Sequence, residues 1–544
     1  MAKLRIQAEG MTCDHCEKTV EGALLSAGAK DATADFRRSE TTFEFEGDTS
    51  LIASAVRDAG YSTGKAETLA AEPVILSGRG GVDYDLVAIG AGSAAFAAAI
   101  RATNLGARVA LVERNTVGGT CVNLGCIPSK NLLAASETYH HAGRHPFAGI
   151  SSSQDGVDMG ALIDMKAGIV SMLRKEKYLD LAEHYGFEII TGTARFTSPE
   201  TIDVDGREIR AGHFLISTGS APCAPPIEGL AESGCLTSTT AMELKELPES
   251  MVVIGGNYIG LELGQVFANL GTKVTIVEAL DRIAPLEEPE ISEWMKRILA
   301  DEGIGVVTGA KVTRVEGGER KAVIAEADGE ERRFEVAEVL VATGRRPVLD
   351  GLDLDKGGIE TDERGRLVLD DELHTTNAKV LAAGDVTGAP QFVYVAAAQG
   401  TVAADNAISN AGRKMDYAAL PRVTFTSPNI AAVGLTDEQA RAQGYDCDCR
   451  TLELEHIPRP IVNMDTRGAF KIVAERGTGK VLGVHAIGAN AGDVILAGVY
   501  AVKFGLTIQD LADTWAPYLT MAEGIKLTAQ TFTTDVDKLS CCAA

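Results

Sequence analysis

Two stretches of the chain repeat one pattern, a buried strand, a glycine turn, a helix, and a second strand that ends in glutamate. In the first, residues 85–89 are followed by GAGSAAFAAAI, and Glu113 lies 23 residues after Gly90. In the second, residues 251–254 are followed by GGNYIGLELGQVF, and Glu278 again comes 23 residues after the first glycine. Strand–helix–strand units of this kind build parallel sheets. The repeat therefore predicts an α/β chain with two Rossmann-like nucleotide-binding domains.

The first unit has the residues that a phosphate-binding turn needs. Gly90, Gly92 and Ala95 give the pattern GxGxxA between strand and helix. Small residues let the backbone approach a pyrophosphate, and the helix N-terminus offers N–H groups to it. Glu113 is placed to accept a hydrogen bond from a ribose hydroxyl. Strand, turn, helix and acid agree, which favours a dinucleotide site over a merely glycine-rich turn.

The second unit departs from this pattern at one position. It keeps Gly255 and Gly260, but Asn257 occupies the place of the second glycine. The alternative is a structural unit without a ligand, and the repeated spacing argues against it. Glu278 would bond a free ribose 2′-hydroxyl and repel a 2′-phosphate, an effect that Arg282 would offset in part. We therefore predict that NADH is accepted well.

Length and charge exclude several classes of protein. A chain of 544 residues is too long for one core and predicts several domains. Its net charge of −25 argues against nucleic acid as a partner. The N-terminus has no apolar signal region, and no run of about 18 apolar residues occurs. We expect a cytoplasmic protein without membrane insertion.

Six of the ten cysteines form three close pairs. Thiolates bind soft metal ions and exchange with other sulfur atoms. Three pairs therefore suggest that a soft metal ion or a sulfur group passes from one thiol pair to another. The first pair, CxxC, is also typical of a thioredoxin-like redox site or half a zinc site. The last pair has a plain alternative as an irregular terminus. The pairs are Cys13 with Cys16, Cys121 with Cys126, and Cys541 with Cys542.

The pattern of expected elements changes along the chain. Residues 1–66 predict a small βαββαβ, ferredoxin-like domain with the CxxC on a loop, and residues 67–82 are rich in linker residues. After about residue 420, alternating strands precede helices, which predicts an α+β domain.

Residues 118–130, GGTCVNLGCIPSK, resemble the redox-active signature of the flavin disulfide reductases. STG at 217–219, ATGRRP at 342–347 and AAGD at 382–385 follow in the order of that family. The resemblance covers about residues 83–544 and implies FAD, NAD(P)H and a homodimer. It divides this part into residues 83–220 and 346–415 for FAD, 221–345 for NAD(P)H, and 416–544 for dimerisation.

The same resemblance assigns roles to single residues. It makes Cys126 the sulfur next to the flavin and Cys121 the exchanging sulfur, with Lys130 near the flavin ring and Asp385 near its ribityl chain. A helix N-terminus at these cysteines would favour the thiolate. The positions assigned to cofactor binding are Gly90, Gly92, Ala95, Glu113, Gly119, Thr120, Lys130, Thr218, Gly219, Gly255, Gly260, Glu278, Gly344 and Asp385.

One departure from the family pattern concerns its C-terminal histidine, which passes a proton to a leaving thiol. In APYLTMAE, Glu523 is kept, but Tyr518 stands in the histidine's place. Tyrosine, with a pKa near 10, is a poor proton shuttle at neutral pH. Tyr178 lies where the family has another active-site tyrosine, although a tyrosine in a helix is most often a packing residue.

Tyr518, the terminal Cys541 and Cys542, and the N-terminal GMTCDHC together resemble the mercuric reductases and their heavy-metal-associated domain. The resemblance implies reduction of thiol-bound Hg(II) to Hg(0), with small-molecule thiols and mercury-transport proteins as partners. It places the metal on Cys13, Cys16, Cys121, Cys126, Cys541 and Cys542. Mercuric reductases commonly use NADPH, contrary to what Glu278 indicates. Two alternatives remain, a disulfide reductase such as dihydrolipoamide dehydrogenase and a copper-handling binding protein.

Overall fold

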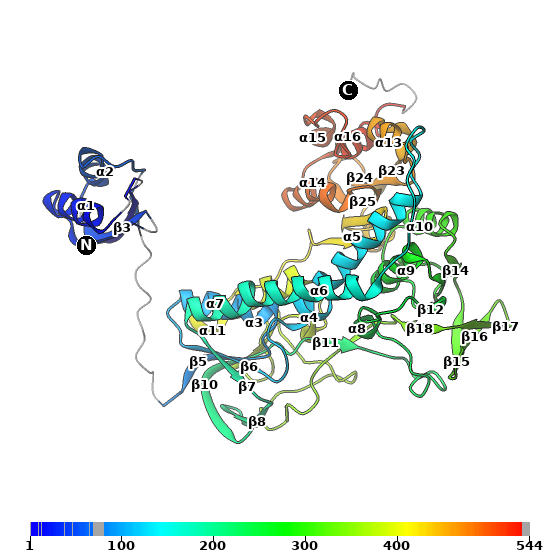
Figure 1. Ribbon diagram of the computed structural model, residues 1–544, viewed down its shortest axis with the longest axis horizontal. Helices are drawn as coiled ribbons and strands as arrows, with labels where there is room; N and C mark the ends of the chain where they lie inside the picture. The colour runs from blue at the N-terminus through cyan, green and yellow to red at the C-terminus, as the bar shows by residue number, and fades with distance from the viewer. Residues whose placement is uncertain are drawn as a thin grey trace.

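The structure, a computed structural model, describes residues 2–8, 10–11, 13–36, 39–45, 47–64, 66–68 and 81–535. Figure 1 shows the small N-terminal domain, two α/β regions and the C-terminal domain. Cys541 and Cys542 lie outside the described residues.

The N-terminal domain has the predicted βαββαβ order. Its elements are β1 (Ala2–Gln7), α1 (Asp14–Ser26), β2 (Lys30–Asp35), β3 (Glu40–Phe45), α2 (Thr49–Asp58) and β4 (Glu67–Thr68). The strands pair in the order β2-β3-β1-β4, and Ile6, Val20, Leu24, Phe43 and Ile52 fill its core. β4 pairs with β1 and occupies the first two residues of the segment 67–82 that we assigned to the linker. This domain has a core of its own.

The first nucleotide unit forms a sheet in the order β7-β6-β5-β10, and β20 joins it beside β10. Helix α3 packs on α11, and its buried alanines allow this close approach. β20 comes from the chain that follows the second unit, so this sheet is completed late in the sequence. The elements are β5 (Tyr84–Ile89), α3 (Ser93–Asn104), β6 (Val109–Glu113), β7 (Glu188–Thr191), β8 (Ala194–Ser198), β9 (Thr201–Val204), β10 (Arg207–Ile216), β20 (Val380–Ala382) and α11 (Val393–Ser409).

Helices that follow the first unit carry the central cysteine pair. They are α4 (Gly119–Leu124), α5 (Cys126–Gly143), α6 (Met159–Arg174), the π-helical turn η1 (Lys175–Leu179) and α7 (Asp180–Tyr185). α5 packs against α4 and α6, and also against helix α9 of the second unit. Helix α5, which begins at Cys126, therefore lies between the two nucleotide units (Figure 1).

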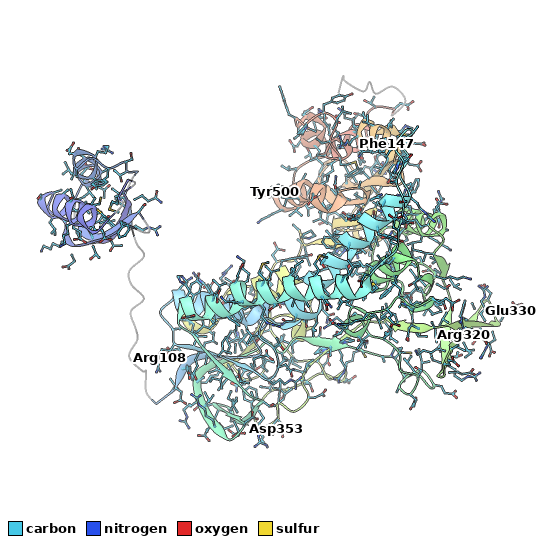
Figure 2. All side chains as sticks on the ribbon, in the orientation of Figure 1. Arg108, Phe147, Arg320, Glu330, Asp353 and Tyr500 are labelled. Atoms are coloured by element: carbon cyan, nitrogen blue, oxygen red, sulfur yellow. The ribbon has the colours of Figure 1, made fainter. Side chains whose placement is uncertain are left out.

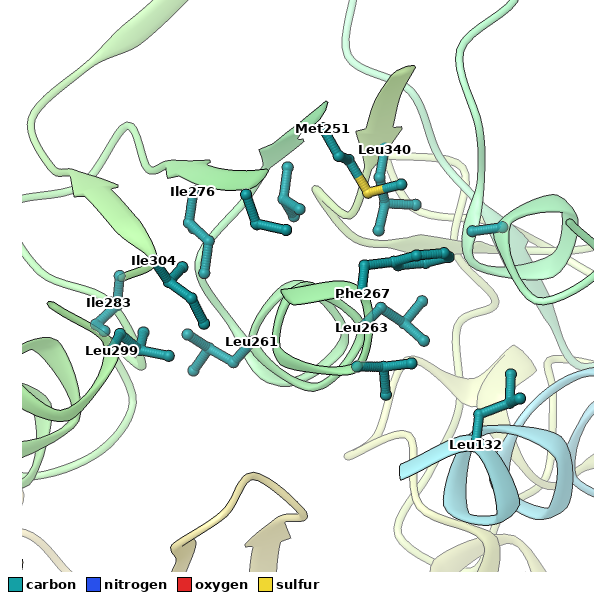
Figure 3. Close-up of a cluster of buried hydrophobic side chains, with 14 of the residues drawn as sticks. Leu132, Met251, Leu261, Leu263, Phe267, Ile276, Ile283, Leu299, Ile304 and Leu340 are labelled. Carbon is teal, nitrogen blue, oxygen red and sulfur yellow. The ribbon is translucent and has the colours of Figure 1, made fainter. Parts of the chain in front are cut away.

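The second unit is a parallel sheet in the order β14-β13-β12-β18, with a three-stranded sheet beside it. Figure 3 shows Leu261, Leu263 and Phe267 of α9 packed among side chains such as Met251 and Ile276 of the sheet. The elements are β12 (Ser250–Ile254), α9 (Tyr258–Leu270), β13 (Lys273–Val277), α10 (Pro289–Asp301), β14 (Gly305–Val307), β15 (Lys311–Glu316), β16 (Lys321–Ala327), β17 (Glu330–Val336) and β18 (Glu338–Val341).

The C-terminal domain is an antiparallel sheet in the order β21-β22-β25-β24-β23 with helices against it, as predicted. Its surface exposes large apolar side chains, including Tyr500 of α14 (Figure 2), Phe504 and Trp515. The elements are β21 (Pro421–Thr424), β22 (Asn429–Gly434), α12 (Asp437–Ala442), β23 (Cys447–Glu453), α13 (Pro458–Asn463), β24 (Ala469–Glu475), β25 (Val481–Gly488), α14 (Ala491–Phe504), α15 (Ile508–Asp513) and α16 (Glu523–Gln530).

Among the described residues, no helix combines the length and the apolar character needed to span a membrane.

The substitution Gly260→Ala in α9 tests the close contact between helix and turn in the second unit. A Cβ at this position would lie 1.9 Å from the carbonyl oxygen of Gly255, so Gly260→Ala must displace the helix. We expect a loss of roughly 1–3 kcal/mol of stability, seen as a lower Tm by calorimetry. Gly168→Ala is the control, because a Cβ there meets open space within α6. It should raise stability by roughly 0.5–1 kcal/mol. Equal effects of the two changes would contradict this description of the turn.

Candidate active site

One cavity of about 2100 Å³ runs along both glycine turns and the central cysteine pair. It is larger than the roughly 300–1,000 Å³ of an ordinary small-molecule pocket, as a site for two dinucleotides must be. The predicted residues that line it are Gly90, Gly92, Glu113, Gly119, Thr120, Cys121, Cys126, Lys130, Thr218, Gly219, Gly255, Glu278, Gly344 and Asp385. Ala95 and Gly260 are buried behind the two turns and do not line it.

The two turns have the same backbone geometry. Gly90 and Gly255 have φ angles of 109° and 110°, which favour glycine. A Cβ would lie 2.4 Å from the Ser217 carbonyl oxygen at Gly90, and 2.5 Å from the Ala342 carbonyl oxygen at Gly255. A side chain at either glycine would therefore collide with neighbouring backbone, and both glycines line the cavity without one.

Glu113 holds the first turn in place. Its Oε2 accepts a hydrogen bond from the Ala91 N–H (2.9 Å), and its Oε1 accepts one from the Asn115 N–H (2.8 Å). The carboxylate lines the cavity at the end of β6. It keeps lone pairs for a ribose hydroxyl, because two oxygens offer about four acceptor positions.

The central thiols lie where two helices meet. Cys121 lies in α4, and Cys126 is the first residue of α5. A hydrogen bond between the two sulfurs lowers the pKa of Cys126 to about 7, and the charge of Lys130 acts in the same direction. The same hydrogen bond, together with burial, raises the pKa of Cys121. The shared hydrogen bond and the charge of Lys130 therefore favour the thiolate at Cys126 over the thiolate at Cys121.

An ion pair fixes Lys130 near these thiols. Its Nζ lies 2.7 Å from Oε2 of Glu262, whose side chain is 8% exposed. The Glu262 Oε1 accepts a hydrogen bond from the Phe425 N–H (2.9 Å), and Nζ also lies 4.5 Å from the centre of the Phe425 ring. Sequence reasoning missed Glu262, although a single acid in the apolar stretch YIGLELGQVF was a signal for it.

A second polar chain reaches the predicted flavin side of the cavity. Ser220 Oγ donates to Asp385 Oδ2 (2.7 Å), and Arg345 Nε donates to Ser220 Oγ (2.8 Å). Burial lowers the pKa of Arg345, and the charge of Asp385 counteracts this. Asp385 thus lies at the cavity with its carboxylate already oriented, and Arg345 is a second residue that sequence reasoning missed.

Tyr178 lies beside the thiol pair from an unusual segment, the π-helical turn η1. Its hydroxyl is 3.4 Å from Ser93 Oγ, and its ring packs edge-on against Phe96 with centroids 4.7 Å apart. Burial raises the pKa of Tyr178, and nearby Cys121 and Cys126 act in the same direction. The tyrosine therefore stays protonated and is an uncharged hydroxyl near the sulfurs.

Tyr518 and Glu523 do not meet this cavity within one chain. No described residue that follows Phe425 in the sequence lines the cavity. Glu523 Oε2 accepts a hydrogen bond from the Leu519 N–H (2.7 Å), which orders the turn after Tyr518. The Tyr518 side chain is 52% exposed on the C-terminal domain.

The N-terminal thiols form a separate site. Cys13 is the N-cap of α1, and its Sγ lies 3.5 Å from that of Cys16. A hydrogen bond to Cys16 raises the pKa of Tyr61. Within the described chain, no group of three or more histidine, cysteine or acidic residues is arranged to hold a metal ion.

Lys130→Met tests the charge that stabilises the Cys126 thiolate. Because the lysine lowers the pKa of Cys126, its loss should move the midpoint of Cys126 alkylation to higher pH. The rate of alkylation by iodoacetamide at pH 7 should fall roughly threefold to tenfold. Lys379→Met, which removes an exposed partner of Glu200, is the matched control and should leave the midpoint unchanged. An unshifted midpoint in Lys130→Met would refute the assigned role of Lys130.

Sequence comparisons match three parts of the chain to known domains. Residues 84–400 match the pyridine nucleotide-disulphide oxidoreductase family. Residues 420–529 match the dimerisation domain of that family, and residues 5–62 match the heavy-metal-associated domain.

Similar proteins include a mercuric reductase of Bacillus cereus, 48% identical over 100% of this chain and 87% of its own length. One of Staphylococcus aureus is 48% identical over 99% of both chains, and one of Streptomyces lividans is 52% identical over 85% of this chain and 98% of its own. Among solved structures, the Cu(II) complex of the HOCl-induced flavoprotein disulfide reductase RclA from Escherichia coli is 32% identical, with a TM-score of 0.75. It covers 83% of this chain and 99% of its own. The chain thus belongs to the pyridine nucleotide-disulphide oxidoreductases and, within them, to the mercuric reductase family.

Proposed function

We infer that this protein is a mercury(II) reductase that uses FAD and NAD(P)H to convert Hg(II) to Hg(0). The observation that carries this inference is the Cys121–Cys126 pair in a cavity shared by both dinucleotide turns. The full-length similarity to mercuric reductases supports the same reaction.

The residues of the cavity fit the two cofactors. The turn at Gly90 and the carboxylates of Glu113 and Asp385 suit FAD, and the turn at Gly255 suits NAD(P)H. When bound, these groups supply the two electrons that the metal accepts. The chain itself places Cys121 and Cys126 at the cavity, where they would hold Hg(II).

The thiol pair takes up the metal by ligand exchange. Cys121 and Cys126 displace the two thiol ligands of Hg(II) by exchange, and the proton of Cys121 leaves with the thiolate that it displaces. Lys130 stabilises the Cys126 thiolate, and Glu262 holds Lys130 in position. Two electrons then convert Hg(II) to Hg(0), which binds thiolates weakly and leaves.

We propose that a homodimer completes each site. The match to a dimerisation domain supports it, as do exposed apolar side chains such as Phe504 and Trp515. Tyr518 and Glu523, which lie away from the cavity within one chain, would then serve the cavity of the partner. A tyrosine suffices there, because a departing metal needs no proton.

Metal delivery would begin at two further thiol pairs. Cys13 and Cys16, 3.5 Å apart, would bind Hg(II) from small-molecule thiols or mercury-transport proteins in the cytoplasm. Cys541 and Cys542 would carry it to the inner pair of the partner subunit. Both cysteines of each pair are needed because Hg(II) prefers two soft ligands.

The decisive measurement compares acceptors for the electrons of NAD(P)H. We expect rapid oxidation of NAD(P)H with Hg(II) and excess thiol, and little with oxidised glutathione or lipoamide. Cys126→Ala should abolish the mercury reaction and retain bound flavin, because Gly90 and Glu113 remain. Cys449→Ala, which changes a thiol of the C-terminal sheet outside the cavity, is the control. Faster turnover with a disulfide would favour a disulfide reductase instead.

The double change Cys541→Ala and Cys542→Ala tests the relay. Turnover of Hg(II) held by bulky thiols should fall at least roughly tenfold, because two thiolates are needed to exchange such ligands. Hg(II) bromide is the small comparison substrate and should retain most of its rate. Equal losses with both forms of mercury would disprove the relay.

A further inference from the structure

The carboxylate of Glu278 is fixed at the end of β13 by two backbone hydrogen bonds. Its Oε2 accepts the N–H of Gly256 (2.6 Å), and its Oε1 accepts the N–H of Leu280 (2.8 Å). The residue is 8% exposed and lines the cavity. Turning the carboxylate away would break both hydrogen bonds and leave two N–H groups without a partner.

The first unit offers an internal comparison. Glu113 accepts the N–H of Ala91, which follows the first glycine, and the N–H two residues beyond itself. Glu278 accepts the N–H groups at the two equivalent positions. The AMP half of FAD, which the first unit suits, carries a free ribose 2′-hydroxyl. The second unit therefore repeats an arrangement that suits a free 2′-hydroxyl.

The cation that could reverse this preference, Arg282, is held at a backbone carbonyl. Arg282 Nη2 donates to the carbonyl oxygen of Pro285 (3.0 Å), and Arg282 does not line the cavity. Residues 277–280, which do line it at this end, contain no basic side chain.

Lys311 is the other basic residue to consider. It lines the cavity, and the N–H of its neighbour Ala310 donates to the Glu278 carbonyl oxygen (2.9 Å). However, Lys311 lies directly opposite Glu326 in the β15–β16 pair, so an acid shares its side of the sheet. A 2′-phosphate would meet the fixed Glu278 carboxylate, and it would share Lys311 with Glu326.

We propose that the second dinucleotide site selects NADH over NADPH, and that Glu278 sets this preference. The proposal deepens the proposed function and depends on it for the nicotinamide cofactor. Each carboxylate oxygen accepts one backbone N–H and keeps a lone pair for the ribose 2′-hydroxyl. A phosphate at that position would instead bring like charges together.

Binding of two fragments to the FAD-loaded enzyme isolates the ribose. ADP-ribose and 2′-phospho-ADP-ribose differ only in the phosphate and need no hydride transfer or mercury. By calorimetry, we expect ADP-ribose to bind roughly tenfold to a hundredfold more tightly, and KM for NADH to be lower than that for NADPH by a similar factor. Equal affinity, or tighter binding of the phosphorylated fragment, would overturn the proposal.

Glu278→Gln removes the charge and keeps the shape of the side chain. It should bring the affinity ratio of the two fragments close to one, whereas Arg282→Gln should leave the ratio unchanged. A ratio that changes with Arg282→Gln and not with Glu278→Gln would overturn the assignment. If Glu278→Gln does not fold, the fragment affinities of the unaltered enzyme and of Lys311→Gln still show whether the site prefers NADH or NADPH. Preferred binding of the phosphorylated fragment that Lys311→Gln abolishes would assign the site to NADPH.

The failure of this proposal is distinguishable from failure of the proposed function. Reduction of the bound flavin by NADH or NADPH, measured without mercury, reports the nicotinamide preference alone. An enzyme that prefers NADPH and still reduces Hg(II) would contradict only the role of Glu278.

Discussion

The ion pair between Lys130 and Glu262 connects the parts on which the active site depends. Lys130 belongs to the cysteine-bearing helix α5, and Glu262 belongs to helix α9 of the second nucleotide unit. The same carboxylate accepts the N–H of Phe425, next to the first strand of the C-terminal domain. A buried charge that lost one of these partners would be costly, so three segments keep one relative position.

This constraint explains why the sulfurs lie between the two dinucleotide turns. α5 packs against α9, and its first residue, Cys126, lies at the cavity that both turns line. The lysine that secures the packing also supplies the positive charge that favours the Cys126 thiolate. Packing and chemistry therefore depend on the same side chain, one helical turn from the sulfur.

Sequence patterns predicted the local parts of the molecule well. The turn at Gly90 and the strands followed by helices after about residue 420 were predictable, because glycine position and apolar periodicity are local signals. The partners Glu262 and Arg345 were not predicted, since both depend on contacts across more than a hundred residues. β4 began beyond the expected boundary, because pairing with β1 rather than local sequence decides such a short strand. The locations of Tyr518 and Glu523 away from the cavity also required tertiary structure.

The exposed C-terminal surface has a spectroscopic consequence. The chain has two tryptophans, and Trp515, which is 96% exposed, lies on the face that we propose to meet a partner subunit. The other, Trp294, is partly buried on α10, with the guanidinium of Arg297 5.7 Å from its ring centre. Covering Trp515 would move its emission to shorter wavelength. In the proposed homodimer, Trp515 would thus act as an intrinsic fluorescent reporter of assembly that needs no attached dye.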